Sequence, residues 1–248
     1  MTAKPCRILI LATIVLTLFS LTANAQKRNI PVDKPVSKSS IPTDNKSVSA
    51  TERNHYSTLE LAVVEEINLA RSNPRKFVGF LEEYQKAVKD KLILLPDRVP
   101  FRMIEGVTVI NETIGEMKAV SNLKTLEISD KLSEAARLQL TDLQEDSSLG
   151  HKGKNGSTLQ VRLAQFATVE GKAAENICFR SNAARDVVMI FLIDDGVKSR
   201  MHRKNVLNPA YKKLGVACGT GKNNEMLCVT VFAENLKDGN SASSVVEF

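Results

Sequence analysis

Apolar residues recur at helical spacing from about Tyr56 onward, and this pattern predicts two consecutive helices. The apolar face of the first helix consists of Leu59, Val63, Ile67 and Ala70. This helix should end before Pro74, because the residue before a proline avoids the helical conformation. Asn73 is expected to cap a second helix that has Pro74 at its first position. The buried stripe of the second helix is expected to be Phe77, Leu81, Tyr84 and Val88.

Three later segments also show helical patterns. Ser129 is a suitable N-cap, and residues 157–160 have the Ser-x-x-Gln pattern of a capping box. A further helix is expected to open at Asn182. The apolar positions that follow these three starts are, in order, Leu132, Ala136, Leu140 and Leu143; Leu159, Leu163 and Phe166; and Val187, Val188 and Phe191.

Strand-like segments are fewer and lie mostly near the end of the chain. The β-branched run at residues 107–110 predicts a short strand. Residues 214–218 and 226–232 are also strand-like, and the segment between them carries two glycines and two asparagines. That combination indicates a β-hairpin. The whole pattern predicts several helices followed by an antiparallel hairpin.

The first 25 residues are expected to be a signal peptide rather than part of the fold. Lys4 and Arg7 come before an almost wholly apolar run, and the small residues at 23–25 favour cleavage after Ala25. The apolar run of about 14 residues is shorter than the ~20 that span a bilayer, and an uncleaved anchor is the alternative. We therefore expect a secreted or periplasmic protein with no stable membrane insertion after cleavage.

Composition favours one folded domain after this segment. Residues 26–55 are rich in proline, lysine, serine and asparagine, which predicts a disordered leader. The chain of 248 residues is 43% hydrophobic and 25% charged, as in ordinary globular domains. Loss of Lys4 and Arg7 would leave 32 basic residues against 28 acidic ones. Because this excess is not concentrated in one run, no nucleic acid is expected as a partner.

Three cysteines remain after cleavage, and export would allow disulfides to persist. Cys218 and Cys228 flank the predicted turn, so they would oppose each other across the hairpin and point to one face. Such a pair is close enough for a disulfide, and Cys178 would then be a free thiol. The alternatives are a bond between Cys178 and one of the other two, or three reduced cysteines.

The chain has three histidines, and two of them lie in polar segments without periodicity. His151 follows Gly150 in a turn, and His202 lies within Ser199–Arg203. His55 borders the predicted leader and is expected to be exposed. Neither His151 nor His202 falls on an apolar stripe, so neither is expected in the core, although a surface role is the ordinary expectation for such residues.

Five short motifs, in order over residues 57–236, resemble the CAP superfamily of secreted proteins, also called the SCP-like domain. These are Glu66–Arg71; Leu132–Ala136 leading to Gly150-His151; Asn155–Thr158 with Arg162; Ala174–Ile177; and His202–Leu207 followed by Gly215-Val216. The fourth resembles a Gly-Glu-Asn-Ile signature with Ala174 in place of glycine. The resemblance implies an α+β fold, namely a three-layer α/β/α sandwich with a central antiparallel sheet, over residues 56–238. Residues 239–248 would form a tail.

The resemblance also implies a cleft lined by two histidines and acidic residues. His151 and His202 match the histidines, and Glu175 matches the acid of the signature. The fourth member of the cleft is open: Asp195 or its neighbour Asp194 lies near the matching region, and Ser199 occupies a position where bacterial-type members often have serine. We take His151, Glu175, His202, Ser199 and Asp195 as the candidate cleft residues.

This residue set allows three functions, because the family has no single accepted reaction. The leading hypothesis is a secreted binding protein whose cleft takes a lipid, a peptide or a divalent metal such as zinc, held by His151 and His202. The second is a metal-assisted hydrolase that uses His151, Glu175 and His202, in which Glu175 acts as general base and a histidine shuttles protons; Glu175 and His202 are the catalytic candidates. The third is a structural or cell-surface interaction module with a vestigial cleft. No metal or cofactor is certain from the sequence.

Overall fold

A computed structural model describes residues 55–96, 100–179, 181–222 and 224–237. The predicted signal peptide and nearly all of the predicted leader and tail lie outside these ranges. None of the helices in the described ranges has the length and hydropathy that crossing a bilayer requires.

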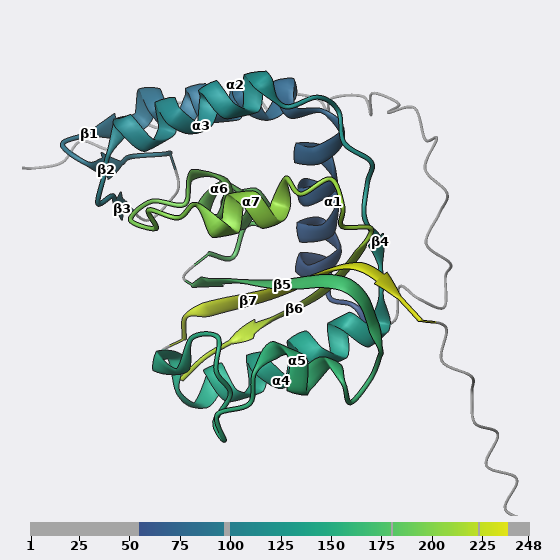
Figure 1. Cartoon of the computed structure of the whole chain (residues 1–248). Helices are drawn as coiled ribbons and strands as arrows, with labels where there is room; N and C mark the ends of the chain where they lie inside the picture. Colours follow the sequence, from purple (N-terminus) through teal and green to yellow (C-terminus); the bar gives the residue numbers. More distant parts are fainter. Residues whose placement is uncertain (1–54, 97–99, 180, 223, 238–248) are drawn as a thin grey trace, which may run out of the picture. The chain divides into compact units, whose positions relative to one another are not determined.

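A four-stranded sheet forms the middle layer of the fold (Figure 1). Its order is β4 (Glu127–Ile128), β6 (Lys213–Thr220), β7 (Met226–Leu236) and β5 (Val169–Phe179). The β6–β7 and β7–β5 pairs are antiparallel, and only the two-residue strand β4 runs parallel to its neighbour. The predicted hairpin is thus confirmed as β6 and β7.

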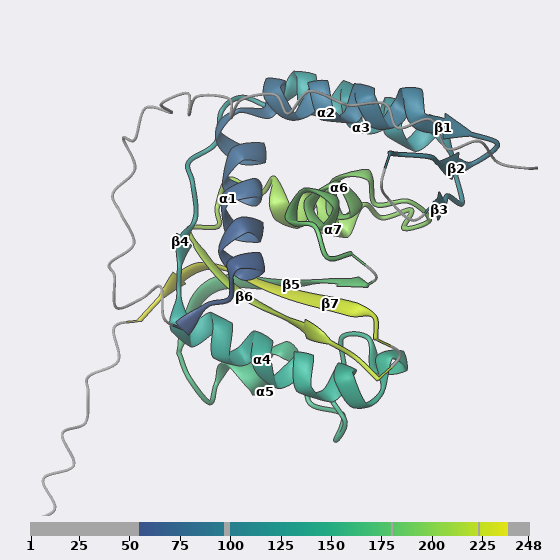
Figure 2. The same cartoon turned by 180° about the vertical axis from the view of Figure 1, so that it is seen from behind.

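Helices cover both faces of this sheet (Figures 1 and 2). One face carries α4 (Asp130–Glu145) and α5 (Leu159–Leu163), and the other carries α1 (Thr58–Ser72), α6 (Ala184–Ile193) and α7 (Met201–Val206). Each face has its own buried apolar cluster. The predicted α+β class with a largely antiparallel central sheet is confirmed.

The first two helices form where the pattern predicts them, but the predicted stripe of the second is only partly right: Tyr84 is half-buried, and Val88 lies just beyond the end of the helix. Helix α1 begins with a capping box between Ser57 and Glu60. It ends at Asn73, whose side chain then accepts a hydrogen bond from the backbone of Lys76 and caps α2 (Pro74–Ala87). Tyr56 is buried, and its hydroxyl donates to Asp130 on α4, so the fold is anchored at the first residue where periodicity was predicted.

The strand predicted at residues 107–110 is wrong, because these residues open helix α3 (Val107–Ala119). Gly106, with φ of +74°, precedes the helix. The β-branched run favours a strand only as a local propensity, which tertiary packing overrides. The buried positions of the helix lie on one face, namely Val109, Ile110, Thr113, Ile114 and Met117.

A small three-stranded sheet, which the sequence did not predict, lies between α2 and α3. It consists of β1 (Val88–Lys89), β2 (Leu92–Ile93) and β3 (Phe101–Arg102), all antiparallel. Asp90 and Lys91 both have positive φ, as the two central residues of a tight type I′ hairpin turn do. This sheet forms a wall beside α6 that becomes important below.

Two predicted helix starts are shifted. Thr158, not Ser157, caps α5, since its hydroxyl accepts from the backbone of Val161. Helix α6 begins at Ala184 rather than at Asn182, and no side chain caps it. Ser129 caps α4 as predicted, and a short 3-10 turn, η2 (Ser147–Leu149), follows that helix.

The predicted disulfide between Cys218 and Cys228 is confirmed. The two residues are register partners in β6 and β7, and their Cα atoms are 4.2 Å apart. Cys178 is a free, buried thiol, also as predicted. It is the register partner of Cys228 in β5, so the three cysteines form one row across the sheet.

Candidate functional site

His151 and His202, 51 positions apart in the sequence, lie side by side at the β5 edge of the sheet. Their ring centroids are 6.3 Å apart and the rings are tilted by 33°. His151 comes from the loop after η2, and His202 is the second residue of α7. Both line a cavity of about 1010 Å³, which we call the histidine cleft. Its lining includes His151, Thr158, Glu175, Met201, His202 and Tyr211.

Glu175 fixes the ring of His151. One carboxylate oxygen, Oε1, lies 2.9 Å from Nδ1 of His151, and the other, Oε2, accepts a 2.7 Å hydrogen bond from Nη2 of Arg162. The side chains of Glu175 and Arg162 are only 3% and 2% exposed. Glu175 therefore uses both oxygens within the protein, as a buried carboxylate must when it remains charged.

Buried Gln139 holds the loop that carries His151. Its amide nitrogen on α4 donates to the carbonyl oxygens of Gly150 and Lys152, at 2.5 and 3.3 Å. Gly150 has φ of +60°, a conformation that glycine adopts without strain. The loop is thus tied to a rigid helix on both sides of His151.

Asp194, rather than the predicted Asp195, fixes the ring of His202. Its Oδ1 lies 2.7 Å from Nδ1 of His202, and its Oδ2 accepts a 2.9 Å bond from the backbone N–H of the same residue. Asp195 instead accepts from the backbone N–H groups of Ile104 and Glu105. Asp194 ends α6 with φ of +54°, and this reversal of the chain sends the two consecutive aspartates in different directions.

Ser199 does not join the histidines. It is exposed in the turn before α7 and lies outside the lining of the cleft. Three further residues, which the sequence analysis did not assign to the cleft, support it through hydrogen bonds: Gln139, Arg162 and Asn176. Asn176 donates to the carbonyl oxygen of His202 at 3.0 Å and accepts from Asn205 at 2.8 Å, which fastens α7 to β5. Arg162 and Asn176 both lie within the five sequence motifs. Their presence in those motifs was the only feature of the sequence that could have indicated a role in the cleft.

Two arginines hold the segment around His202. Arg203 is fully buried, and its guanidinium donates to the carbonyl oxygens of Leu192 and Ile193 and to Thr113. Arg200 pairs with two glutamates, Glu105 and Glu112. These hydrogen bonds lower the pKa of each glutamate to about 2. Buried hydrogen bonds and ion pairs therefore hold the segment that carries His202 in place.

The two carboxylates select one tautomer in each ring. An ionised carboxylate only accepts hydrogen bonds, so Nδ1 of each histidine carries the proton and Nε2 keeps its lone pair. This arrangement, in which a carboxylate orients a ring through the nitrogen that the metal does not use, is the usual support for metal-binding histidines. Two imidazoles on one tetrahedral zinc would have ring centroids about 5.3 Å apart, slightly closer than the pair here.

The donor set fits a divalent metal bound in an open site. Within the described residues, no group of three or more histidine, cysteine, aspartate or glutamate side chains is arranged to hold a metal. Two imidazoles would leave the other positions to water or to a ligand, and this is typical of exchangeable rather than structural metals. Glu175 and Asp194 hold the two rings through Nδ1 and are not themselves among the candidate metal donors.

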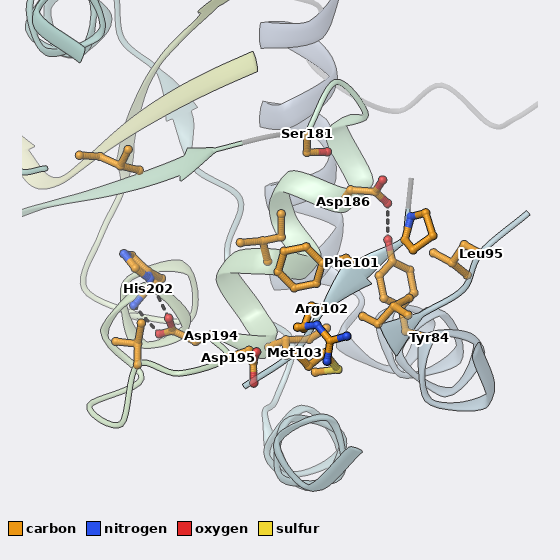
Figure 3. A pocket seen from close by; sticks show the side chains of 16 residues that line it. Tyr84, Leu95, Phe101, Arg102, Met103, Ser181, Asp186, Asp194, Asp195 and His202 are labelled. Atoms are coloured by element: carbon orange, nitrogen blue, oxygen red, sulfur yellow. Dashed lines mark hydrogen bonds and ion pairs between the residues drawn. The ribbon is translucent and has the colours of Figure 1, made fainter. Parts of the chain in front are cut away.

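His202 also borders a second cavity, of about 480 Å³, which we call the side pocket (Figure 3). The side pocket lies between the small sheet β1–β3 and α6. Phe191, on α6, packs against the ring of His202 with centroids 5.9 Å apart. The two cavities therefore share the side chain of His202 as part of their walls.

Comparison with known proteins gives matches of two kinds. The uncharacterized protein YkwD of Bacillus subtilis is 29% identical over 94 residues, which cover 38% of this chain and 35% of YkwD. The chain thus spans about a third of that relative. An outer surface protein of Borrelia burgdorferi aligns with a TM-score of 0.40 and 20% identity, over 52% of this chain and 90% of that protein. An extracellular SCP-domain protein of Bacillus anthracis aligns with a TM-score of 0.39 and 22% identity, over 52% of this chain and 39% of that protein.

The family model for CAP, the cysteine-rich secretory protein family, matches residues 64–232. The match covers more than half of the chain and includes every element from α2 to β6, together with both histidines, Glu175 and Asp194. The chain belongs to the CAP family.

Proposed function

We propose that this protein is an extracellular ligand-binding module whose histidine cleft binds a divalent metal, such as zinc, through His151 and His202. One observation carries the proposal: two adjacent imidazoles each have Nδ1 fixed by a buried carboxylate, which leaves Nε2 for a ligand. When bound, the metal would supply a Lewis acid that takes an oxygen or nitrogen atom of the ligand.

The geometry favours binding over the hydrolase hypothesis. Glu175 could serve as general base only if one of its oxygens were free to take a proton, but Arg162 and His151 occupy both. In this proposal, Glu175 and Asp194 are positioning residues for the rings. A ligand would enter from the open side of the cleft, where the side chain of His151 is 58% exposed.

The export part of the proposal rests on the N-terminal pattern and on the disulfide. A disulfide between Cys218 and Cys228 persists in an oxidising compartment, which agrees with secretion. N-terminal sequencing of the exported protein should begin at Gln26. A mature protein that retains Lys4 and Arg7 would contradict signal cleavage and favour the uncleaved anchor.

We propose residues 56–238 as the domain limits.

Zinc titration against a chromogenic chelator tests the metal. Metal-free wild-type protein should bind one zinc ion, and His151→Ala and His202→Ala should each lower the affinity at least about tenfold, because each removes one of two protein ligands. His55→Ala is the matched control, since His55 is exposed and does not line the cleft. Equal zinc binding by all four proteins would overturn the proposal.

A screen for hydrolase activity distinguishes the binding function from the hydrolase alternative. Wild type and His202→Ala should be equally inactive against ester, peptide and glycoside panels if the cleft only binds. Turnover by zinc-loaded wild type that disappears in His202→Ala would replace the binding function with the hydrolase. Absence of both zinc binding and turnover would favour the interaction module.

A further inference from the structure

Strand β5 forms an edge of the central sheet. In the sheet order β4-β6-β7-β5, it pairs with β7 on one side only. The neighbouring pair of strands fixes the direction of its backbone groups. The Cα atoms of Cys218 and Cys228 are 4.2 Å apart, which is close to the spacing of about 4.5 Å in a non-hydrogen-bonded pair. The backbone N–H and C=O groups of Cys228 therefore point away from β6 and toward Cys178, its register partner in β5.

These directions alternate along an antiparallel pair of strands. Cys178 and Asn176 therefore turn their backbone groups to β7. Ala173, Glu175 and Ile177 turn theirs to the open edge of the sheet. Within the described ranges, no other backbone segment hydrogen-bonds to these three residues. Such a row of outward N–H and C=O groups is a template for pairing with another extended chain.

The histidine cleft runs along this edge. Its lining includes residues 169 and 171–175 of β5. Helices α5 and α7 lie on opposite faces of the sheet beside β5 (Figure 1), and both contribute to the lining. The outer half of β5 is largely exposed, and its buried half begins at Glu175, which holds His151. An extended chain on the edge would thus lie between the two helices and reach the histidines with one end.

The side chains of the cleft suit an acidic chain with apolar residues. Lys152 and Lys172 are exposed in the cleft, and the one carboxylate among the described lining residues, Glu175, is already paired with Arg162. Carboxylates of a bound chain would therefore meet groups of the opposite sign. Successive side chains of an extended chain point to opposite faces. They would alternately contact the apolar lining beside α5 and beside α7, namely Leu159, Leu163 and Ala164 on one side and Met201 and Tyr211 on the other.

We propose that the histidine cleft binds an acidic, extended peptide that adds a strand to the edge of β5. In this mode of recognition, main-chain hydrogen bonds supply the affinity, and contacts with alternate side chains supply the specificity. The inference rests on the binding function proposed above and deepens it by naming the class of ligand. It does not require the metal, because the groups that pair with the peptide belong to the backbone of β5.

Fluorescence anisotropy with metal-free protein tests the pairing. The probe is a labelled hexapeptide of alternating valine and glutamate, amidated at its C-terminus. It should bind, and the same peptide with lysine in place of glutamate should bind at least about tenfold more weakly. N-methylation of every valine removes one set of alternate N–H groups, and N-methylation of every glutamate removes the other.

Only one of these two sets can face β5. One methylated peptide should therefore bind at least about tenfold more weakly than the parent, and the other should bind nearly as well. No binding of the acidic peptide, or equal losses in both methylated peptides, would overturn the proposal.

A proline at the edge locates the bound strand. Ala173→Pro removes an N–H that points outward and keeps the pairing with β7, which is the position where edge strands tolerate proline. A carbonyl of the peptide would lose its donor, so the affinity should fall at least about tenfold. Ala173→Ser keeps the N–H and is the matched control. Thermal unfolding confirms that both variants are folded, and equal peptide affinities in the two would refute the location.

A charge variant tests the same cleft without a change of backbone. Lys172→Glu reverses an exposed charge in the lining and should weaken binding of the acidic peptide severalfold, with a smaller effect at high salt. Lys76→Glu is the matched control, because Lys76 is exposed on α2 and does not line the cleft. Equal affinities in the two variants would contradict the preference for an acidic peptide.

Zinc titration and sedimentation distinguish the alternatives. Zinc binding by a wild-type protein that does not bind the acidic peptide would overturn this inference alone. Peptide binding by a wild-type protein that does not bind zinc would overturn the metal proposal alone. A wild-type dimer that becomes monomeric in Ala173→Pro would assign the edge of β5 to a second copy of the chain and overturn the peptide.

Discussion

Asp194 holds His202 by two hydrogen bonds, one to ring Nδ1 at 2.7 Å and one to the backbone N–H at 2.9 Å. Asp194 is almost fully buried and lies at the turn between α6 and α7. One side chain thus sets the start of α7 and the tautomer of the ring together. Because both oxygens of Asp194 accept hydrogen bonds, a side chain of the same size with only one accepting oxygen could not make both contacts.

Asp194→Asn should lower zinc affinity about 10–100-fold while the protein stays folded. Asparagine tolerates the left-handed conformation at this position. Its oxygen can still accept from the backbone of His202, but its NH₂ group cannot accept from Nδ1. The ring proton would then move to Nε2 and block metal binding. Asp195→Asn is the matched control, because Asp195 contacts no histidine, and equal losses in both variants would contradict this role. Chelator competition measures both affinities.

Removal of only one partner of the buried Arg162–Glu175 pair should be costly. Glu175→Leu leaves the guanidinium of Arg162 without its partner, and we expect a loss of about 3–5 kcal/mol in unfolding free energy. The double variant Arg162→Leu/Glu175→Leu removes both charges and should recover most of that loss. Zinc affinity should stay low in both, because His151 has lost its orienting carboxylate. Urea denaturation measures stability, and a double variant as unstable as the single one would contradict the pairing argument.

The helices with regular apolar stripes could be predicted from the sequence, and β5 could not. Its buried run at residues 175–178 includes Glu175 and Asn176, so the site residues themselves interrupt the apolar pattern of the strand. The first half of β5 is exposed and has a register shift between Glu170 and Ala173. The polar residues that β5 contributes to the cleft therefore remove the apolar pattern by which the strand could have been predicted.

The approach of the two histidines needs the tertiary fold. Motif resemblance suggested that His151, Glu175 and His202 belong together, but it could not choose between Asp194 and Asp195. That choice depends on a left-handed residue at the end of α6, a backbone conformation without a local signal such as glycine. The Cys218–Cys228 bond was predictable, because hairpin register alone fixes the distance between the two residues.

Replacement of both bonded cysteines should destabilise the protein by roughly 2–3 kcal/mol, because Cys218–Cys228 closes a short loop in the unfolded chain. Cys218→Ala/Cys228→Ala tests this by urea denaturation, with Cys178→Ala as the single-cysteine control.

Burial raises the pKa of the Cys178 thiol to about 12. The native wild-type protein should therefore resist thiol labelling at neutral pH and react only when unfolded. Rapid labelling of the native protein would contradict the buried, protonated thiol.

Gly215 allows β6 to pack directly against α4. A Cβ at this position would lie 2.2 Å from the carbonyl carbon of Leu132 and 2.4 Å from the backbone nitrogen of Ser133. Gly215→Ala should therefore destabilise the protein by about 2–3 kcal/mol through overpacking against rigid backbone. Gly79→Ala, in helix α2 with open space around its position, should instead stabilise by about 0.5–1 kcal/mol. Thermal unfolding compares the two, and equal melting temperatures would contradict the close packing.

Acid should remove the stabilisation that the ion pairs of Arg200 give to the folded protein. Its hydrogen bonds lower the pKa of Glu105 and of Glu112 to about 2 in the folded protein, below the value of about 4.3 for an unfolded glutamate. The stabilisation is thus complete above about pH 4.3 and is lost as the pH falls towards about 2. In Glu112→Gln, the melting temperature should be lower at about pH 6 and should fall less on acidification. Glu65→Gln, on the exposed side of α1, is the control and should follow wild type. Parallel acid profiles for wild type and Glu112→Gln would show that this pair adds nothing to stability.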